Sequence, residues 1–207
     1  MKSLLIERCN FSYDSKLVNE SIKRNNGLLI VEGVVQRAEA RNQNGRIYPI
    51  NILKREVEKY IKGPIAENRA LGELDHPDSS VINLKNVSHN IKKLWWDGND
   101  LMGRIEILPT PSGNILKTLF ENNITVGISS RGMGSVQSLG EGTVEVQDDF
   151  DVVGWDFVST PSTQGAFMRP INEGVTYPYS LITDRYSKVN SLITDIICTR
   201  SGVCDIK

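Results

Sequence analysis

The chain has 207 residues, of which 39% are hydrophobic and 24% are charged, and its formal net charge at pH 7 is -1. This composition is typical of a folded protein with one sizeable core. The balanced charge gives no reason to expect a nucleic acid or a membrane surface as a partner. We find no apolar run long enough to cross a bilayer, and the first residues do not follow the pattern of a signal peptide.

The cysteines indicate reduced thiols rather than a disulfide framework. Cys9, Cys198 and Cys204 are an odd number and form no cluster, which suits a cytoplasmic compartment. The chain has only two histidines and no CxxC pair, so a structural zinc site is not expected.

In the first third of the chain we predict an N-terminal segment, a strand and a helix. Residues 1–27 are assigned to the segment, which we expect to be loose because its second half is polar. The β-branched run at 28–35 predicts a strand, and Asn44-Gly45 predicts a tight turn. A helix is predicted after Pro49 and is expected to end at Gly63-Pro64. Its apolar face would consist of Ile52, Leu53, Val57, Tyr60 and Ile61.

The rest of the chain reads mainly as strands. Two β-type runs separated by residues 97–100 predict a hairpin. A short helix is expected at 114–122, and further strands are expected at 124–130, 144–146 and 150–158. This order predicts an α+β fold built on a mostly antiparallel sheet or barrel with a few flanking helices. We expect residues 28–170 to form the main domain and residues 171–207 a C-terminal arm or removable tail.

The segment LGELDHP at 71–77 contains the first candidate for chemistry. Pro77 ends regular structure directly after His76, so the imidazole is expected at a strand end where it can meet solvent and substrate as a general base. The competing interpretation is a partly exposed histidine with no special role.

The segment GISSRGMG at 127–134 contains the second candidate. A serine that leaves a strand among small residues can present its hydroxyl to a substrate backbone. Amides near Arg131 and Gly132, with the arginine charge, are candidates for an oxyanion hole. The segment also fits a polar turn, and it does not match the GxSxG elbow of hydrolases.

The third candidate is Asp156, which lies within the apolar run VVGWDFV at 152–158. A buried carboxylate is costly unless it is paired, and a carboxylate bonded to an imidazole fixes its tautomer. The competing interpretation is that strand alternation turns Asp156 outward to water.

Five stretches of this sequence resemble the prohead core protein proteases of large contractile-tailed phages, a family related in fold to the herpesvirus maturation protease, assemblin. The stretches cover most of residues 28–162 in the expected order, and GELDHP together with GISSRG is specific to the family. They are VEGVVQRAEARNQNGRIYP (31–49), ALGELDHP (70–77), IKKLWWDGNDLMGRIEIL (91–108), GISSRGMGS (127–135) and VVGWDFVSTPS (152–162).

The resemblance implies a serine endopeptidase with no metal and no organic cofactor. It places the nucleophile on Ser129, the general base on His76 and, most plausibly, the third acidic residue on Asp156. Arg131, Gly132 and Ser130 are expected to hold the oxyanion or the substrate. The alternatives are Ser130 as nucleophile if the strand slips by one residue, His89 as base, and Asp75 as orienting acid.

The resemblance also implies where the protein acts and what it cuts. Its expected substrates are scaffold, core and capsid proteins inside the assembling prohead in the host cytoplasm, and homo-oligomers are expected. The family tends to cut after Glu in an aliphatic-x-Glu pattern. Ile171-Asn172-Glu173-Gly174 fits this pattern, so we hypothesise self-cleavage between Glu173 and Gly174. Ile30-Val31-Glu32-Gly33 fits it too, but is expected in a core strand.

Three rival functions have less support from the sequence. A catalytically silent scaffold or core protein with the same fold has no reason to keep His76, Ser129 and Asp156 together. An esterase-like hydrolase is disfavoured by the absence of GxSxG and of alternating βα units. A nucleic-acid-binding module is disfavoured by the absence of a basic stripe.

Overall fold

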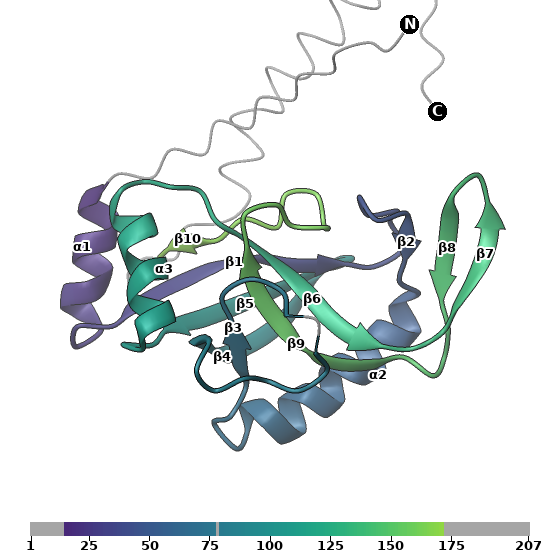
Figure 1. The fold of residues 1–207 in the computed structure, drawn as a ribbon, viewed down its shortest axis with the longest axis horizontal. Helices are drawn as coiled ribbons and strands as arrows, with labels where there is room; N and C mark the ends of the chain where they lie inside the picture. Colours follow the sequence, from purple (N-terminus) through teal and green to yellow (C-terminus); the bar gives the residue numbers. More distant parts are fainter. Residues whose placement is uncertain (1–14, 78, 172–207) are drawn as a thin grey trace, which may run out of the picture. The chain divides into compact units, whose positions relative to one another are not determined.

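The computed structural model describes residues 15–77 and 79–171 (Figure 1). The chain divides into two compact units, Met1–Asn172 and Glu173–Lys207, and every described residue lies in the first. The described elements are α1 (Ser15–Arg24), β1 (Leu29–Arg37), β2 (Arg46–Ile47), α2 (Ile50–Tyr60), the π-helical turn η1 (Ile61–Ile65), β3 (Leu71–Glu73), β4 (Val87–Asp97), β5 (Asp100–Ile107), α3 (Pro111–Glu121), β6 (Gly127–Met133), β7 (Val136–Gly140), β8 (Thr143–Val146), β9 (Asp151–Val158) and β10 (Arg169–Pro170). None of the described helices is long and apolar enough to span a membrane.

The largest sheet has five strands in the order β10-β1-β5-β4-β3, and all its pairings are antiparallel. Its centre is the predicted hairpin, in which β4 and β5 pair around a turn that places Gly98 at φ +58°. A positive φ is easy for glycine, so Gly98 suits this position. The hairpin prediction is confirmed.

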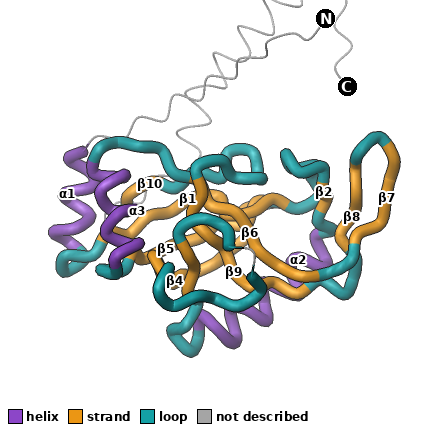
Figure 2. The backbone as a smooth tube through the Cα atoms, viewed as in Figure 1, coloured by secondary structure: helices purple, strands orange, loops and turns teal. Residues whose placement is uncertain are grey.

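Two smaller sheets complete the described fold (Figure 2). Strands β6 and β9 form an antiparallel ribbon, and β7 and β8 form a hairpin that is extended by β2. The α+β prediction is confirmed, and the described strands form open sheets rather than a closed barrel. The edge strand β7 was not predicted because all five of its residues are exposed, so it lacks the alternation of a half-buried strand.

Helix α2 follows its predicted pattern at Ile52, Leu53, Val57 and Tyr60, which are buried, but Ile61, expected on the same face, is exposed. Backbone bonding continues beyond the expected stop at Gly63-Pro64 as the turn η1, because a wider helical turn tolerates the missing proline N–H. Helix α3 begins three residues before the predicted start. The Thr110 side chain caps it by accepting a hydrogen bond from the Gly113 amide at 3.0 Å, and Pro111 occupies the first turn.

The expectation of a loose segment before residue 28 is wrong for Ser15–Arg24, which forms helix α1 against α3 and β1 (Figure 1). Val18 and Ser21 are fully buried there. The Ser21 hydroxyl donates to the Ile30 carbonyl at 3.3 Å, which joins the helix to β1. Its polar composition hid the helix, because a single narrow buried face needs few apolar residues.

The core joins the five-stranded sheet, the β6–β9 ribbon and the helices. Phe157 on β9 is fully buried and meets the rings of Phe120 on α3 and His89 on β4 edge-to-face, at centroid distances of 6.0 and 4.7 Å. Leu74, at the end of β3, forms a parallel bridge to Phe157. The end of β3 is therefore fixed beside the C-terminal end of β9.

Candidate active site

His76 reaches β9 through a tight turn after β3. The Asp75 amide donates to the Phe157 carbonyl at 2.8 Å, and Asp75 adopts φ +65°, a left-handed conformation that aspartate tolerates better than most residues. The His76 side chain is 38% exposed, so its ring stays open to solvent.

The His76 ring contacts Asp156 rather than Asp75. His76 Nδ1 lies 2.9 Å from Asp156 Oδ2. This contact fixes the imidazole with its proton on Nδ1 and leaves Nε2 as the basic nitrogen. The structure thus brings together two of the sequence-predicted site residues, and the alternative acid Asp75 is exposed on the turn.

Asp156 is fully buried and held as an anion by several donors. Besides His76, the Glu73 amide donates to Asp156 Oδ1 at 2.9 Å, and Arg131 Nε and Nη2 donate to Oδ2 and Oδ1 at 2.9 and 3.1 Å. Burial alone would raise the pKa of Asp156. The hydrogen bonds from His76, from the Glu73 amide and from Arg131 outweigh that effect and lower the pKa below its usual value.

Strand register decides which serine faces this carboxylate. Ser129 on β6 lies directly opposite Asp156 on β9, whereas Ser130 lies opposite Trp155. Directly paired residues of an antiparallel ribbon project from the same face, so Ser129 shares a face with Asp156. Ser130 shares the other face with Ile128 and Trp155, which belong to the core.

The Ser129 hydroxyl is 2.9 Å from the Ser162 hydroxyl. Ser129 is only 4% exposed. Across the residues described, no hydrogen bond joins Ser129 to His76, so the structure brings the serine to the face of the His76–Asp156 pair without closing a three-residue chain. The backbone of Ser162 is held in place by Gln43, whose backbone N–H donates to the Ser162 carbonyl at 2.9 Å.

The Arg131 guanidinium turns toward carboxylates. In addition to its two bonds to Asp156, Nη2 donates to Glu73 Oε1 at 3.0 Å and Nη1 donates to the Ser79 carbonyl at 2.6 Å. Its side chain is 10% exposed. The β6–β9 register shifts between Arg131 and Gly132, where Val153 is the extra residue on β9, and such a bulge locally disrupts the ladder.

Strand β6 continues through Gly132 to Met133, beyond the predicted strand end at residue 130. A Cβ atom at Gly132 would lie 2.5 Å from the Phe150 ring, so the strand needs glycine to pass this side chain. Gly132 stays a candidate for substrate contact, whereas Ser130 lies on the opposite face of β6 from Ser129.

Sequence reasoning missed Glu73 and Ser162 as members of this cluster. Glu73 lies in the quoted GELDHP motif, and an acidic residue in a short apolar strand was the available signal. Ser162 ends the quoted stretch at 152–162, but nothing in its own sequence context points to Ser129.

His89, the alternative base, is fully buried on β4. Its Nε2 lies 3.0 Å from the Trp155 carbonyl and its Nδ1 lies 2.9 Å from the Ser88 hydroxyl. The backbone of Gly72 passes so close that a Cβ there would lie 2.3 Å from His89 Nε2. Desolvation lowers the pKa of His89 to about 4, so the ring is a neutral core residue and cannot meet substrate.

Neutral His89 predicts that the protein is destabilised in mild acid. The ring is neutral in the folded state down to about pH 4, while an exposed histidine binds its proton below about pH 6.5. The stabilising contribution is therefore complete above pH 6.5 and is lost as the pH falls toward 4. We expect a loss of about 3 kcal/mol across this window, measured by urea unfolding at a series of pH values. A His89→Asn variant should show a flatter dependence in the same window. An equally steep loss in that variant would contradict the assignment.

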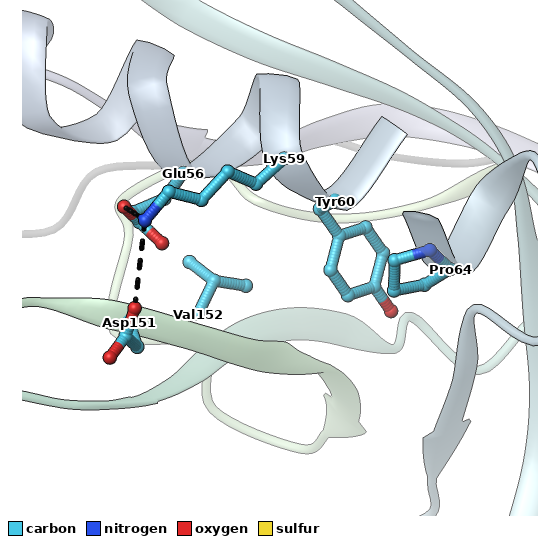
Figure 3. Close-up of a pocket in the computed structure, with 6 residues that line it drawn as sticks. All are labelled: Glu56, Lys59, Tyr60, Pro64, Asp151 and Val152. Atoms are coloured by element: carbon cyan, nitrogen blue, oxygen red, sulfur yellow. Dashed lines mark hydrogen bonds and ion pairs between the residues drawn. The ribbon is translucent and has the colours of Figure 1, made fainter. Parts of the chain in front are cut away.

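A separate pocket lies between α2 with η1 and the start of β9 (Figure 3). Lys59 Nζ is 3.8 Å from Asp151 Oδ1 at one side, and Tyr60 stands at the other. None of the predicted catalytic residues lines it. The pocket is lined by Glu56, Lys59, Tyr60, Pro64, Asp151 and Val152. In the described part of the chain, no group of three His, Cys, Asp or Glu side chains is arranged to hold a metal ion.

The two aliphatic-x-Glu matches differ in what the structure shows of them. Glu173 and Gly174 lie outside the described residues. Glu32 and Gly33 lie in β1, which pairs with β10 on one side and β5 on the other, so this match is part of a sheet, as predicted.

The comparisons with known proteins agree on one family. A model of the prohead core protein serine proteases matches residues 10–176. The prohead core protein protease of Enterobacteria phage T4 is 35% identical over 145 residues, which cover 69% of this chain and 68% of that protein. The solved structure of the capsid assembly protease of bacteriophage T4 matches with a TM-score of 0.60 and 33% identity, covering 64% of this chain and 82% of the other.

Proposed function

Since the chain belongs to the prohead core protein serine protease family, we propose that it is an endopeptidase whose nucleophile is Ser129, whose general base is His76 and whose orienting acid is Asp156. The family makes it a serine protease of capsid maturation that acts inside the assembling prohead on phage prohead proteins. The proposal adds the residues that perform the reaction and the bond that they cut.

One observation carries the proposal: Ser129 is the cross-strand partner of Asp156, the residue whose carboxylate contacts His76. Asp156 pairs directly with Ser129 across the β6–β9 ribbon and bonds His76 at 2.9 Å through its side chain. The imidazole and the hydroxyl therefore approach one face of the ribbon from two segments that are more than 50 residues apart in sequence.

In the proposed reaction, the Ser129 side chain rotates from Ser162 toward His76 Nε2 when substrate binds. His76 takes the hydroxyl proton as Ser129 Oγ attacks the scissile carbonyl, and Asp156 stabilises the imidazolium that forms. His76 then gives the proton to the leaving amine. Water, deprotonated by the same imidazole, releases the acyl group and restores the serine.

The oxyanion is assigned to backbone amides at the bulge around Arg131 and Gly132. The Arg131 guanidinium already binds Asp156, Glu73 and the Ser79 carbonyl, so its side chain is better placed to hold Asp156 than to meet substrate. Ser130, on the opposite face from Ser129, is left a role in the local backbone geometry.

We further propose that cleavage follows Glu in an aliphatic-x-Glu pattern. The test is a pair of peptides that contain Ile-Asn-Glu-Gly or Ile-Asn-Gln-Gly, incubated with the full chain and followed by mass spectrometry. The expected result is cleavage after Glu in the first peptide and a rate at least about tenfold lower for the second, because a site that pairs a charged side chain rejects its neutral isostere. Equal rates would exclude selection for the glutamate charge.

Self-cleavage between Glu173 and Gly174 extends the same specificity to the chain itself. The supporting observation is the match of Ile171-Asn172-Glu173 to the pattern. The full chain, stored at assay temperature, should yield two products that meet at this bond, and Glu173→Gln should stay intact. Persistence of the intact wild-type mass in a preparation that cleaves the peptide would refute self-cleavage.

The alternative of a catalytically silent scaffold protein has less support. A scaffold needs neither an exposed imidazole on a buried carboxylate nor a serine opposite that carboxylate. The peptide assay also separates the two functions, because a silent protein cuts neither substrate.

A further inference from the structure

Glu73 forms the buried end of a chain of charges behind the proposed catalytic pair. The side chain of Glu73 is 1% exposed, that of Arg131 is 10% exposed and that of Asp156 is 0% exposed. Arg131 Nη2 bonds both carboxylates, at 3.0 Å to Glu73 Oε1 and at 3.1 Å to Asp156 Oδ1. The guanidinium is thus shared between two acids, and only Asp156 touches His76.

Because Arg131 is shared between two carboxylates, the net charge beside His76 differs from that of a simple Arg131–Asp156 pair. With Arg131 alone beside it, Asp156 would belong to a neutral pair, and a neutral pair stabilises an imidazolium less than a free carboxylate does. With Glu73 ionised, two carboxylates surround one guanidinium and the three groups carry a net charge of -1. The negative charge that a general base needs behind it is thereby restored.

We propose that Glu73 is a positioning residue of the reaction, whose negative charge compensates Arg131 and so leaves the His76–Asp156 pair with a net negative neighbour. This inference rests on the proposed catalytic assignment. Glu73 Oε1 also accepts a hydrogen bond from the backbone N–H of Asn83 at 3.0 Å, while Arg131 donates to the Ser79 carbonyl. The same pair therefore fixes the segment at 79–83 that follows the turn of His76.

The remaining titratable groups around the cluster do not supply this charge. His89 on β4 is buried and neutral, since burial lowers its pKa to about 4. Tyr60 on α2 is also neutral, because burial, and to a smaller extent the charge of Asp156, raises its pKa. Asp75 lies on the exposed side of the turn, where solvent screens its charge. Apart from Asp156 itself, Glu73 is the buried acid that bonds Arg131.

The test is the pH dependence of kcat/KM for Glu73→Gln, a substitution that keeps the shape and the Oε1 acceptor and removes the charge. We expect the acidic limb of the profile to move to lower pH by roughly half a unit to one unit. We expect kcat to fall about three- to tenfold with KM within about twofold, because the change weakens proton transfer rather than binding. The double variant Glu73→Gln with Arg131→Gln again has a net charge of -1, and its acidic limb should return toward the wild-type position.

Glu32→Gln is the matched control. Glu32 is also a strand glutamate that is ion-paired with an arginine, Arg104, but it lies on β1, three strands away from β3 in the same sheet. Its profile should overlay that of the wild type. If Glu73→Gln overlays the wild type as well, Glu73 carries no charge that His76 experiences and the inference is wrong. A wrong catalytic assignment gives a different result, because Ser129→Ala would then cleave the peptide as fast as the wild type.

A second measurement covers the case in which Glu73→Gln loses too much activity for a profile. In a Ser129→Ala background, the His76 imidazole is titrated by NMR with and without Glu73→Gln. The midpoint should be lower in the double variant, and identical midpoints would overturn the inference.

Discussion

Ser129→Ala is expected to reduce peptide cleavage by a factor of at least about 10³, with binding and stability nearly unchanged. The hydroxyl is the proposed attacking group, and its removal leaves only the positioning and oxyanion contributions. The lost contact to the Ser162 hydroxyl is a neutral hydrogen bond, worth about 1 kcal/mol. Initial rates are measured by mass spectrometry with the Ile-Asn-Glu-Gly peptide, and folding is checked by thermal unfolding.

Ser130→Ala and Ser162→Ala are the controls for this prediction. Ser130 lies on the other face of β6, so its loss should leave the rate within about tenfold of the wild type. Ser162 contributes one hydrogen bond to the resting serine, so the same limit applies. A loss in either control as large as that of Ser129→Ala would move the nucleophile or add a member to the machinery.

Asp156→Asn is expected to lower kcat by about 10³ to 10⁴. Asp156 Oδ2 accepts from His76 Nδ1, and an amide nitrogen at this position would donate instead. His76 would then carry its proton on Nε2, where it cannot accept the serine proton. The NMR signals of the imidazole nitrogens report the tautomer directly, and the rate is measured with the same peptide.

Asp100→Asn provides the matched control for Asp156→Asn. Asp100 is bound by both Nε and Nη2 of Arg37, as Asp156 is bound by both of Arg131, but it contacts no histidine. Its variant should cleave at the wild-type rate. If Asp156→Asn keeps both the Nδ1-H tautomer and the wild-type rate, Asp156 does not orient the base.

Local patterns were enough to predict much of the fold. Apolar spacing predicted α2, because periodicity reports which face of an element is buried. The four turn residues at 97–100 between two β-type runs predicted the β4–β5 hairpin. Helix α1 and strand β7 were missed for the opposite reason. The first is mostly polar in composition, although its few apolar residues share one helical face, and the second has no buried residue, so neither stands out as an apolar element.

The candidate site was predictable residue by residue but not as an arrangement. Three short segments of the sequence contain His76, Ser129 and Asp156, and the family resemblance favoured a catalytic role for each over its competing interpretation. The sequence has no local signal for the register that pairs Ser129 with Asp156, nor for the contact of Arg131 with Glu73, because both depend on how β3, β6 and β9 come together. The Arg131 charge was expected to stabilise the oxyanion. Because its side chain bonds Asp156 and Glu73, it is assigned to holding Asp156 instead.

Trapping the nucleophile tests the central claim most directly. The full chain is incubated with a peptidyl phosphonate that carries Ile-Asn-Glu before the phosphorus, and the modified residue is located by peptide mapping. The account predicts one adduct, on Ser129, that is absent from Ser129→Ala and forms much more slowly in Asp156→Asn. An adduct on Ser130 or Ser162, or none in a preparation that cleaves the peptide, would contradict it.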